Sequence, residues 1–340
     1  MAYITFQPSD HFNTKLYTGN GSTQSITGVG FQPDWVWLKQ RSGSASSNKL
    51  YDAVRGTTKY IASNNTGAEG TESGVTSFDS DGFTLGSAGG TNGNSETYAS
   101  WNWKANGSGS SNTDGSITST VSANTTAGFS IVTHTGNGST ATIGHGLGAV
   151  PKVIFSRKRA VDNWFTYHHG LGNGKYVLLE ATDAQATSSN VWNDTTPTSA
   201  VFTKGGPANE NAATYISYCF AEKKGFSRFG TYKGNSSASG PFIYCGFKPA
   251  LFVVKRYDAS GEYWNVLDSK RNPENPADDF LYWSENLAEG VKTSKIDFVS
   301  NGIKIRGTDG AFNNSAGLYL YLAFAEHPFV SSNGVPATAR

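Results

Sequence analysis

Short stretches of alternating hydrophobic and polar residues run along the whole chain, and clusters of Gly, Asn, Asp and Ser separate them at intervals of roughly eight to twelve residues. This alternation predicts β-strands with one buried face, and no stretch of about ten residues shows the period of an amphipathic helix. Three of the stretches are alike, at residues 98–104, 215–222 and 319–326. Each begins with Tyr, contains further aromatic residues and ends on a charged residue. The pattern therefore predicts one domain design that is used three times.

Other segments recur in the same order before each aromatic stretch. They are a Gly-Asn-Gly or Gly-Asn-Ser turn, at residues 19–21, 136–138 and 234–236, and a proline ahead of an apolar run, at Pro33, Pro151 and Pro249. Asn-Gly favours a tight hairpin because both central residues of a type I′ turn need a positive φ. Proline is tolerated where a strand begins. Each repeat is therefore expected to open with a β-hairpin and to continue into a central strand.

These repeats predict an all-β protein of three tandem antiparallel β-sandwiches, jelly-roll-like, behind a short extended N-terminal arm. The expected units are the arm (1–12), a first repeat (13–107), a Gly/Ser-rich linker (108–127), a second repeat (128–224), a third repeat (225–330) and a C-terminal tail (331–340). The linker is predicted to be flexible by its composition, although Ile117 and Val121 allow one short strand. At about 100 residues each, the repeats are expected to hold separate cores.

The composition excludes several classes of function. Lys and Arg together (27) nearly balance Asp and Glu (26), so the sequence predicts no basic surface for nucleic acid. No apolar run is long enough to cross a bilayer and the N-terminus lacks a signal peptide, so neither membrane insertion nor signal-directed secretion is expected. Cys219 and Cys245 are too few for a disulfide scaffold or a zinc site, and are expected to be buried thiols. No cofactor or metal is predicted.

Two groups of residues are candidates for a catalytic role. His168 and His169 lie between a strand and a Gly-rich turn, but the other repeats have no histidine there, so exposed loop histidines are favoured over a ligand pair. Asp278 and Asp279 are loop acids close to aromatic residues. A glycosidase needs two carboxylates that face each other across a cleft, and nothing in their spacing indicates this. The sequence therefore predicts no catalytic residue, and all four remain candidate surface contacts.

Two further features are candidates for contacts with other molecules. Trp192 lies in a loop outside the shared pattern, which makes it the tryptophan most expected to be exposed, against a neighbouring subunit or the face of a sugar. The N-terminal arm carries Tyr3, Phe6, Pro8 and Phe12. It is expected either to pack on its own first domain or to dock on a neighbouring subunit, for example by pairing with a sheet edge.

Residues 12–39, with the Gly-Asn-Gly turn and the Pro33-Asp34-Trp35 run, resemble the N-terminal part of proteins encoded widely by tailed phages of marine bacteria and cyanobacteria. Residues 50–56 and 78–83 and the short arm are also similar to that family, and the match is looser over the second and third repeats. Members are usually called virion structural or tail-fibre proteins. The resemblance implies a phage particle without fixing a position on it.

The expected function is therefore that of a non-enzymatic virion structural protein on the particle exterior, tail-associated or fibre-like, that binds host surface glycans or another receptor. The alternatives are a capsid decoration protein anchored by the N-terminal arm and a glycan-degrading tailspike. The expected partners are other virion proteins of the tail or capsid. The chain is expected to be made in the host cytoplasm, to end in the virion, and to form a homo-oligomer, for which a homotrimer is the first guess.

Overall fold

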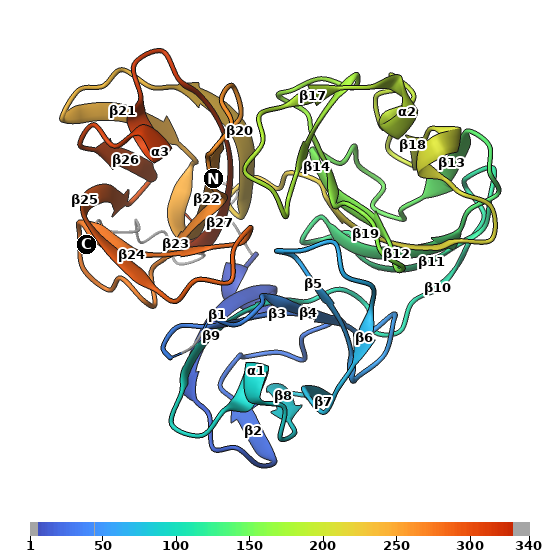
Figure 1. Ribbon diagram of the computed structural model, residues 1–340, viewed down its shortest axis with the longest axis horizontal. Helices are drawn as coiled ribbons and strands as arrows, with labels where there is room; N and C mark the ends of the chain where they lie inside the picture. The colour runs from blue at the N-terminus through green and yellow to red at the C-terminus, as the bar shows by residue number, and fades with distance from the viewer. Residues whose placement is uncertain (1–5, 44, 329–340) are drawn as a thin grey trace.

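The computed structural model describes residues 6–43 and 45–328, which form three β-sandwich lobes around a common centre (Figure 1). The described strands pair antiparallel, and the three helical segments with α labels have four residues each. The prediction of an all-β chain of antiparallel sandwiches is confirmed. Residues 1–5, with Tyr3 of the arm, lie outside the described residues.

The first lobe comprises η1 (Pro8–Asp10), β1 (Phe12–Thr18), β2 (Gln24–Thr27), β3 (Trp35–Gln40), β4 (Lys49–Asp52), β5 (Lys59–Ala62), β6 (Gly70–Thr71), β7 (Val75–Asp79), β8 (Gly82–Leu85), α1 (Gly89–Asn92) and β9 (Thr97–Trp103). The second comprises β10 (Ser110–Asn112), β11 (Ser119–Asn124), β12 (Phe129–Thr135), β13 (Ala141–Gly144), β14 (Val153–Lys158), β15 (Phe165–His168), β16 (Lys175–Leu178), β17 (Ala186–Thr187), α2 (Ser189–Trp192), β18 (Val201–Lys204), η2 (Gly206–Ala208) and β19 (Thr214–Phe220). The third comprises β20 (Ser227–Lys233), β21 (Ser239–Tyr244), β22 (Phe247–Arg256), β23 (Asn265–Asp268), β24 (Ala277–Tyr282), β25 (Gly290–Val299), β26 (Gly302–Arg306), α3 (Gly310–Asn313) and β27 (Leu318–Pro328).

Each lobe has an inner sheet that faces the centre and an outer sheet on the periphery (Figure 1). The inner sheet runs β1-β9-β3-β4-β5-β6 in the first lobe and β10-β11-β12-β19-β14-β15-β16-β17 in the second, against outer sheets β2-β8-β7 and β13-β18. In the third lobe the two layers are continuous, in the order β20-β27-β22-β23-β24-β25-β26-β21. The recurring aromatic stretches form β9, β19 and β27. Each is the neighbour of the first strand of its repeat, which is β1, β12 or β20; the second lobe adds β10 and β11 outside β12.

The central strands of the inner sheets are buried on both faces, and this feature organises the molecule. Because side chains alternate along a strand, Trp101 and Trp103 of β9 join a core shared by all three lobes, whereas Tyr98 points into its own sandwich. Rings from different lobes meet there: Trp35 stacks on Tyr218 with centroids 4.3 Å apart. All eight tryptophans of the chain are fully buried. The recurring aromatics are therefore core residues, but much of that core lies between the repeats.

Three equivalent junctions close the ring of lobes. At the same position of each, a backbone N–H of one lobe donates to a carbonyl of the next, in the pairs Glu69 to Arg159, Gln185 to Tyr257, and Glu289 to Arg41. A side chain at the end of the fourth inner strand also reaches the neighbouring lobe. The Asp52 carboxylate accepts from the Tyr218 hydroxyl at 2.8 Å and the Asp268 carboxylate accepts from the Trp101 indole at 3.1 Å. The pseudo-three-fold arrangement is thus built within one chain.

The segment expected to be a flexible linker is ordered β-structure instead. Residues 108–127 contain β10 and β11, and β11 pairs with β12 along the edge of the second inner sheet. Val121 packs into the core of the second sandwich. Composition misled here because an edge strand with one solvated face needs few apolar residues.

The expected opening hairpin is also wrong, because β1 and β2 do not pair with each other. β1 pairs with β9 in the inner sheet and β2 with β8 in the outer sheet, so the Gly-Asn-Gly turn is an arch between two layers. The turn recurs for a steric reason: a Cβ at Gly19 would overlap the carbonyl oxygen of Gly93, and Gly136 and Gly234 lie equally close to a backbone carbonyl.

The described part of the N-terminal arm packs on its own chain, at the junction of the first and third lobes. Phe6 stacks on His11 at 4.5 Å and lies edge-on to Phe226 at 5.0 Å. Pro8 is buried, and Phe12 is a residue of β1 that stacks on Phe324 of β27 at 5.4 Å. Residues 6–12 of the arm therefore pack on their own chain, as the first of the two expectations had it. They contact the third lobe as well as the first.

Candidate functional site

His168 and His169 are junction residues rather than exposed loop residues. His168 is fully buried, accepts from the Gly170 N–H at its Nδ1 and places Nε2 3.4 Å from the Tyr321 carbonyl oxygen of the third lobe. Burial lowers the pKa of His168 to about 3, and the neighbouring His169 adds to this shift. His169 Nε2 lies 3.0 Å from the Phe229 carbonyl oxygen. His168 occupies the position of Asp52 and Asp268, which a comparison of the three repeats by position could have revealed.

Trp192 is buried, which overturns its prediction as an exposed contact. It ends the short helix α2, whose first turn is capped by the Ser188 side chain. Its ring packs edge-on against Tyr167, with centroids 5.8 Å apart, inside the second sandwich. The segment that was expected to be a loop is therefore a short helix that turns its large side chain inward.

Asp278 and Asp279 are neighbours on β24 and are half-buried. Their backbone N–H groups both donate to the side-chain oxygen of Asn272, at 2.8 Å. Burial, together with the nearby Glu289, raises the pKa of Asp279. The backbone is irregular here, because the register between β24 and β25 shifts between Ala277 and Asp279. The two residues are consecutive, with Cα atoms about 3.8 Å apart, so they lie on one wall of any cleft and do not face each other across it.

Two buried ion-pair networks at the junctions were not anticipated from sequence. Arg55 pairs with Asp52 and with Glu69, and Glu69 also pairs with Arg159 of the second lobe. The third lobe repeats this design with Arg271, Asp268, Glu289 and Arg41. The signal in the sequence is an Asp followed three residues later by Arg, at 52/55 and 268/271. Every charge in these networks has a partner, so they hold the ring together.

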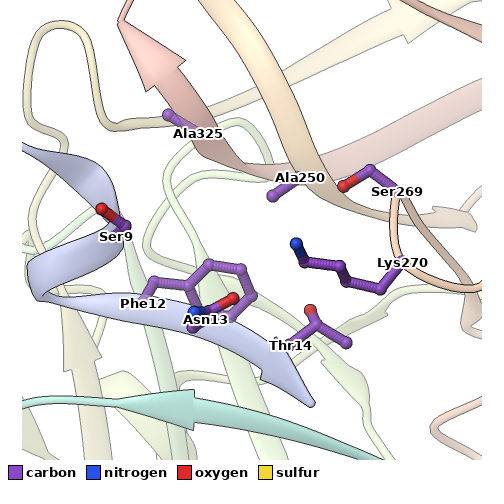
Figure 2. A pocket seen from close by; sticks show the side chains of 8 residues that line it. All are labelled: Ser9, Phe12, Asn13, Thr14, Ala250, Ser269, Lys270 and Ala325. Carbon is purple, nitrogen blue, oxygen red and sulfur yellow. The ribbon is translucent and has the colours of Figure 1, made fainter. Parts of the chain in front are cut away.

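A groove opens at the junction of the third and first lobes, along the outer side of β1 (Figure 2). One end is a cavity of about 100 Å³, lined by Ser9, Phe12, Asn13, Thr14, Ala250, Ser269, Lys270 and Ala325. A shallower hollow of about 280 Å³ shares Asn13, Thr14 and Lys270 and continues past Lys15, Leu16 and Gly28. Lys270 extends toward β1 in Figure 2, and the Thr14 hydroxyl is buried without a hydrogen-bond partner. We call these two hollows the β1 groove.

A pair of exposed aromatic side chains lies on β21, the last strand of the third lobe's sheet. Phe242 is 49 % exposed and Tyr244 is 60 % exposed, on either side of the buried Ile243. The equivalent strands carry Ser25 and Thr27 around Ile26 in the first lobe, and Thr142 and Gly144 around Ile143 in the second. Lys304 is opposite Phe242 on β26, and Arg306 nearby pairs with Asp297. We call Phe242 and Tyr244 the aromatic pair.

No group of three or more His, Cys, Asp or Glu residues that could hold a metal ion occurs among the described residues. In that same part of the chain, no helix is long and apolar enough to span a membrane. Cys219 and Cys245 are buried free thiols, whose pKa values are raised mainly by burial.

Comparison with known proteins places all three lobes in a single family unit. No curated protein and no solved structure matches the chain. One family model matches residues 7–328, from the start of the described arm to the end of β27. The chain therefore belongs to the family described as domain of unknown function DUF7483.

Proposed function

We propose that this chain is a non-enzymatic structural protein on the exterior of a phage particle, tail-associated or fibre-like, and that it binds host surface glycans through the aromatic pair. The observation that carries the proposal is the exposure of Phe242 and Tyr244 on β21. Figure 1 shows β21 at the periphery of the third lobe. The phage context comes from the resemblance of residues 12–39, 50–56 and 78–83 to phage virion proteins.

The chemistry of the aromatic pair suits a sugar. Residues two apart on a strand point to the same face, about 6.6 Å apart along it. Two aromatic rings at that spacing offer an apolar platform for the C–H face of a pyranose ring. Lys304, Arg306 and Asp297 supply charged donors and acceptors for hydroxyl groups beside it. Exposed aromatic side chains that the equivalent strands lack are a feature of recognition surfaces.

The closed ring supports a structural role. A shared core and three junctions hold the outer sheets in fixed relation, so a contact at β21 is mechanically tied to the other two lobes. A rigid scaffold that presents a small exposed platform is suited to adhesion.

The test is binding of the full chain to a panel of immobilised bacterial surface polysaccharides, including those of marine and cyanobacterial hosts. Phe242→Ala and Tyr244→Ala are expected to weaken binding by roughly 2- to 10-fold each, the worth of one aromatic contact. The matched controls Ser25→Ala and Thr27→Ala, at the equivalent positions of β2, should leave binding unchanged. Failure of the wild-type chain to bind any polysaccharide, or equal binding by the double aromatic variant, would refute the glycan proposal.

The capsid decoration alternative keeps one supporting observation, the pseudo-three-fold ring, which would suit a three-fold position on a shell. Counting copies per particle separates the two positions. A few copies at the tail support the proposal, whereas a copy number that follows icosahedral symmetry supports decoration.

A further inference from the structure

We propose that the β1 groove binds an extended, acidic segment of a partner protein, which adds to the free edge of β1 as a further strand of the first inner sheet. This surface is separate from the aromatic pair, and the inference does not depend on the glycan proposal. It assigns the groove to assembly with another protein through strand addition.

The first step is the orientation of the β1 backbone. β1 is the terminal strand of its sheet and pairs with β9. The His11 carbonyl accepts from the Lys104 N–H, and the Gly19 N–H donates to the Glu96 carbonyl, so the odd-numbered residues between them are the ones bonded to β9. Thr14 and Leu16 therefore direct their backbone N–H and C=O groups into the groove.

The second step is an internal precedent. Thr14 and Leu16 correspond to Ile131 and Thr133 of β12, because the partners Trp101 and Ala99 on β9 match Tyr218 and Ile216 on β19. In the second lobe this same edge is covered by β11, with Ser122 opposite Ile131 and Thr120 opposite Thr133. The chain thus shows that its own inner sheet accepts a strand at the place where the first lobe has a groove.

The third lobe closes its equivalent edge in another way. There His169 of the second lobe reaches the Phe229 carbonyl of β20, and Gly170 lies against Thr231. The residue at the first lobe's edge that corresponds to Gly170 is Lys270, two positions after the junction aspartate. Of the three edges in the described structure, the one along β1 is therefore the edge with an open hollow and a lysine beside it.

The fourth step is charge. Lys270 and Lys15 line the groove and no carboxylate does. Lys15 is close to Asp81, whose pKa is lowered mainly by hydrogen bonds from Gly28 and Gly30 and further by Lys15. Lys270 has no ion-pair partner within the described residues. Opposite charges on facing strands stabilise a pair and like charges destabilise it, so an acidic strand fits this edge and the β1 edge of a second copy does not.

The cavity at the end of the groove gives the incoming strand a place for a side chain. Its volume of about 100 Å³ is bounded by Phe12, Ala250 and Ala325 on the apolar side and by the unpartnered Thr14 hydroxyl on the polar side. That space equals roughly three water molecules of liquid, which is the size of a small side chain. An acidic segment with a small residue at this position matches the groove from end to end.

The experiment uses the full chain and a labelled peptide that copies residues 117–125, the chain's own model of the added strand. A second peptide carries Val121→Glu, because Val121 is opposite Val132, the residue of β12 that corresponds to Lys15. Fluorescence anisotropy should show that the acidic peptide binds at least about threefold more tightly than its parent, the effect of one cross-strand charge pair. Hydrogen exchange should show new protection at the amides of Thr14 and Leu16.

Three variants of the full chain complete the test. Lys270→Glu should weaken binding of the acidic peptide by about threefold or more, whereas Lys59→Glu, an exposed lysine on β5, should not. Leu16→Pro removes an N–H that faces the groove and would bond to the added strand, so it should abolish binding. The variant should still fold, because proline is tolerated on an edge strand. The proposal is overturned if the peptide leaves Thr14 and Leu16 unprotected, or if Lys270→Glu binds it as well as wild type does. If the full chain self-associates and Lys270→Glu strengthens this self-association, the proposal is also overturned, because the groove would then bind a second copy of the chain.

Discussion

The junction carboxylate Asp52 offers the sharpest test of how the ring is held together. Asp52 is fully buried and accepts from the Arg55 guanidinium, from the backbone N–H groups of Val54 and Arg55, and from the Tyr218 hydroxyl at 2.8 Å. Asp52→Ala leaves the Tyr218 hydroxyl without its acceptor and the Arg55 Nε–H without its partner, so that the guanidinium and the hydroxyl keep only each other on this side. Breaking a buried ion pair by removing one member costs about 3–5 kcal/mol, a large share of a typical stability of about 5–15 kcal/mol.

Equilibrium unfolding in guanidinium chloride, followed by the fluorescence of the eight buried tryptophans, measures this cost. Asp268→Ala should lose a similar amount, because Asp268 makes the same contacts with Arg271 and Trp101. The control is Lys158→Ala, whose partner Glu210 is 61 % exposed at its side chain, so a loss below about 1 kcal/mol is expected. If Asp52→Ala is no more destabilising than Lys158→Ala, the reasoning about the junctions is refuted.

Further predictions follow from the same contacts. The chain should unfold in a single cooperative calorimetric transition, because one core joins all three lobes, and residues 128–224 expressed alone should aggregate; separate transitions would contradict this. The pKa of His168 lies near 3 in the folded protein against an ordinary value of 6.5, so its contribution to stability is intact above pH 6.5 and is lost as the pH falls toward 3. The part of the stability loss between pH 7 and pH 4.5 that is due to His168 should be about 2–3 kcal/mol, and His168→Gln should reduce the total loss by about that amount; an unchanged pH profile would count against the buried neutral imidazole. Gly19→Ala should destabilise by about 1–3 kcal/mol through overlap with the Gly93 carbonyl, while Gly89→Ala, which meets no atom within 4 Å, should be nearly neutral; equal thermal midpoints for the two variants would rule out the steric explanation.

The sequence was sufficient to establish the three repeats, the all-β class and most of the strands, because these depend on local signals. Period-two alternation selects extended backbone, and Gly, Asn and Pro mark the turns. The recurring turn glycines were visible without the structure, although their reason was not. Gly19 is needed because it packs against the backbone carbonyl of Gly93, which is a tertiary contact. The Asn-Gly pair alone suggested a hairpin instead.

Burial of individual side chains could be predicted only where a repeat supplied a comparison. Trp192 lies outside the shared pattern, so no periodicity indicated that α2 turns it into the second sandwich. His168 looked like a loop residue because its neighbours are polar, yet it takes the place of a buried aspartate. The Ser- and Thr-rich β11 gave a linker composition because it lies next to the edge strand β10, where little apolar surface is buried.

The tertiary structure alone decided how the three repeats meet. Alternation shows that a strand has two faces, but β9 and β19 are buried on both. A sequence does not say whether the second face meets its own sandwich or another lobe. The ring, its junction charges and the β1 groove arise from contacts between residues about 100 to 250 positions apart. Local periodicity carries no information about contacts at that range. For this reason the repeats could be predicted from the sequence and the ring could not.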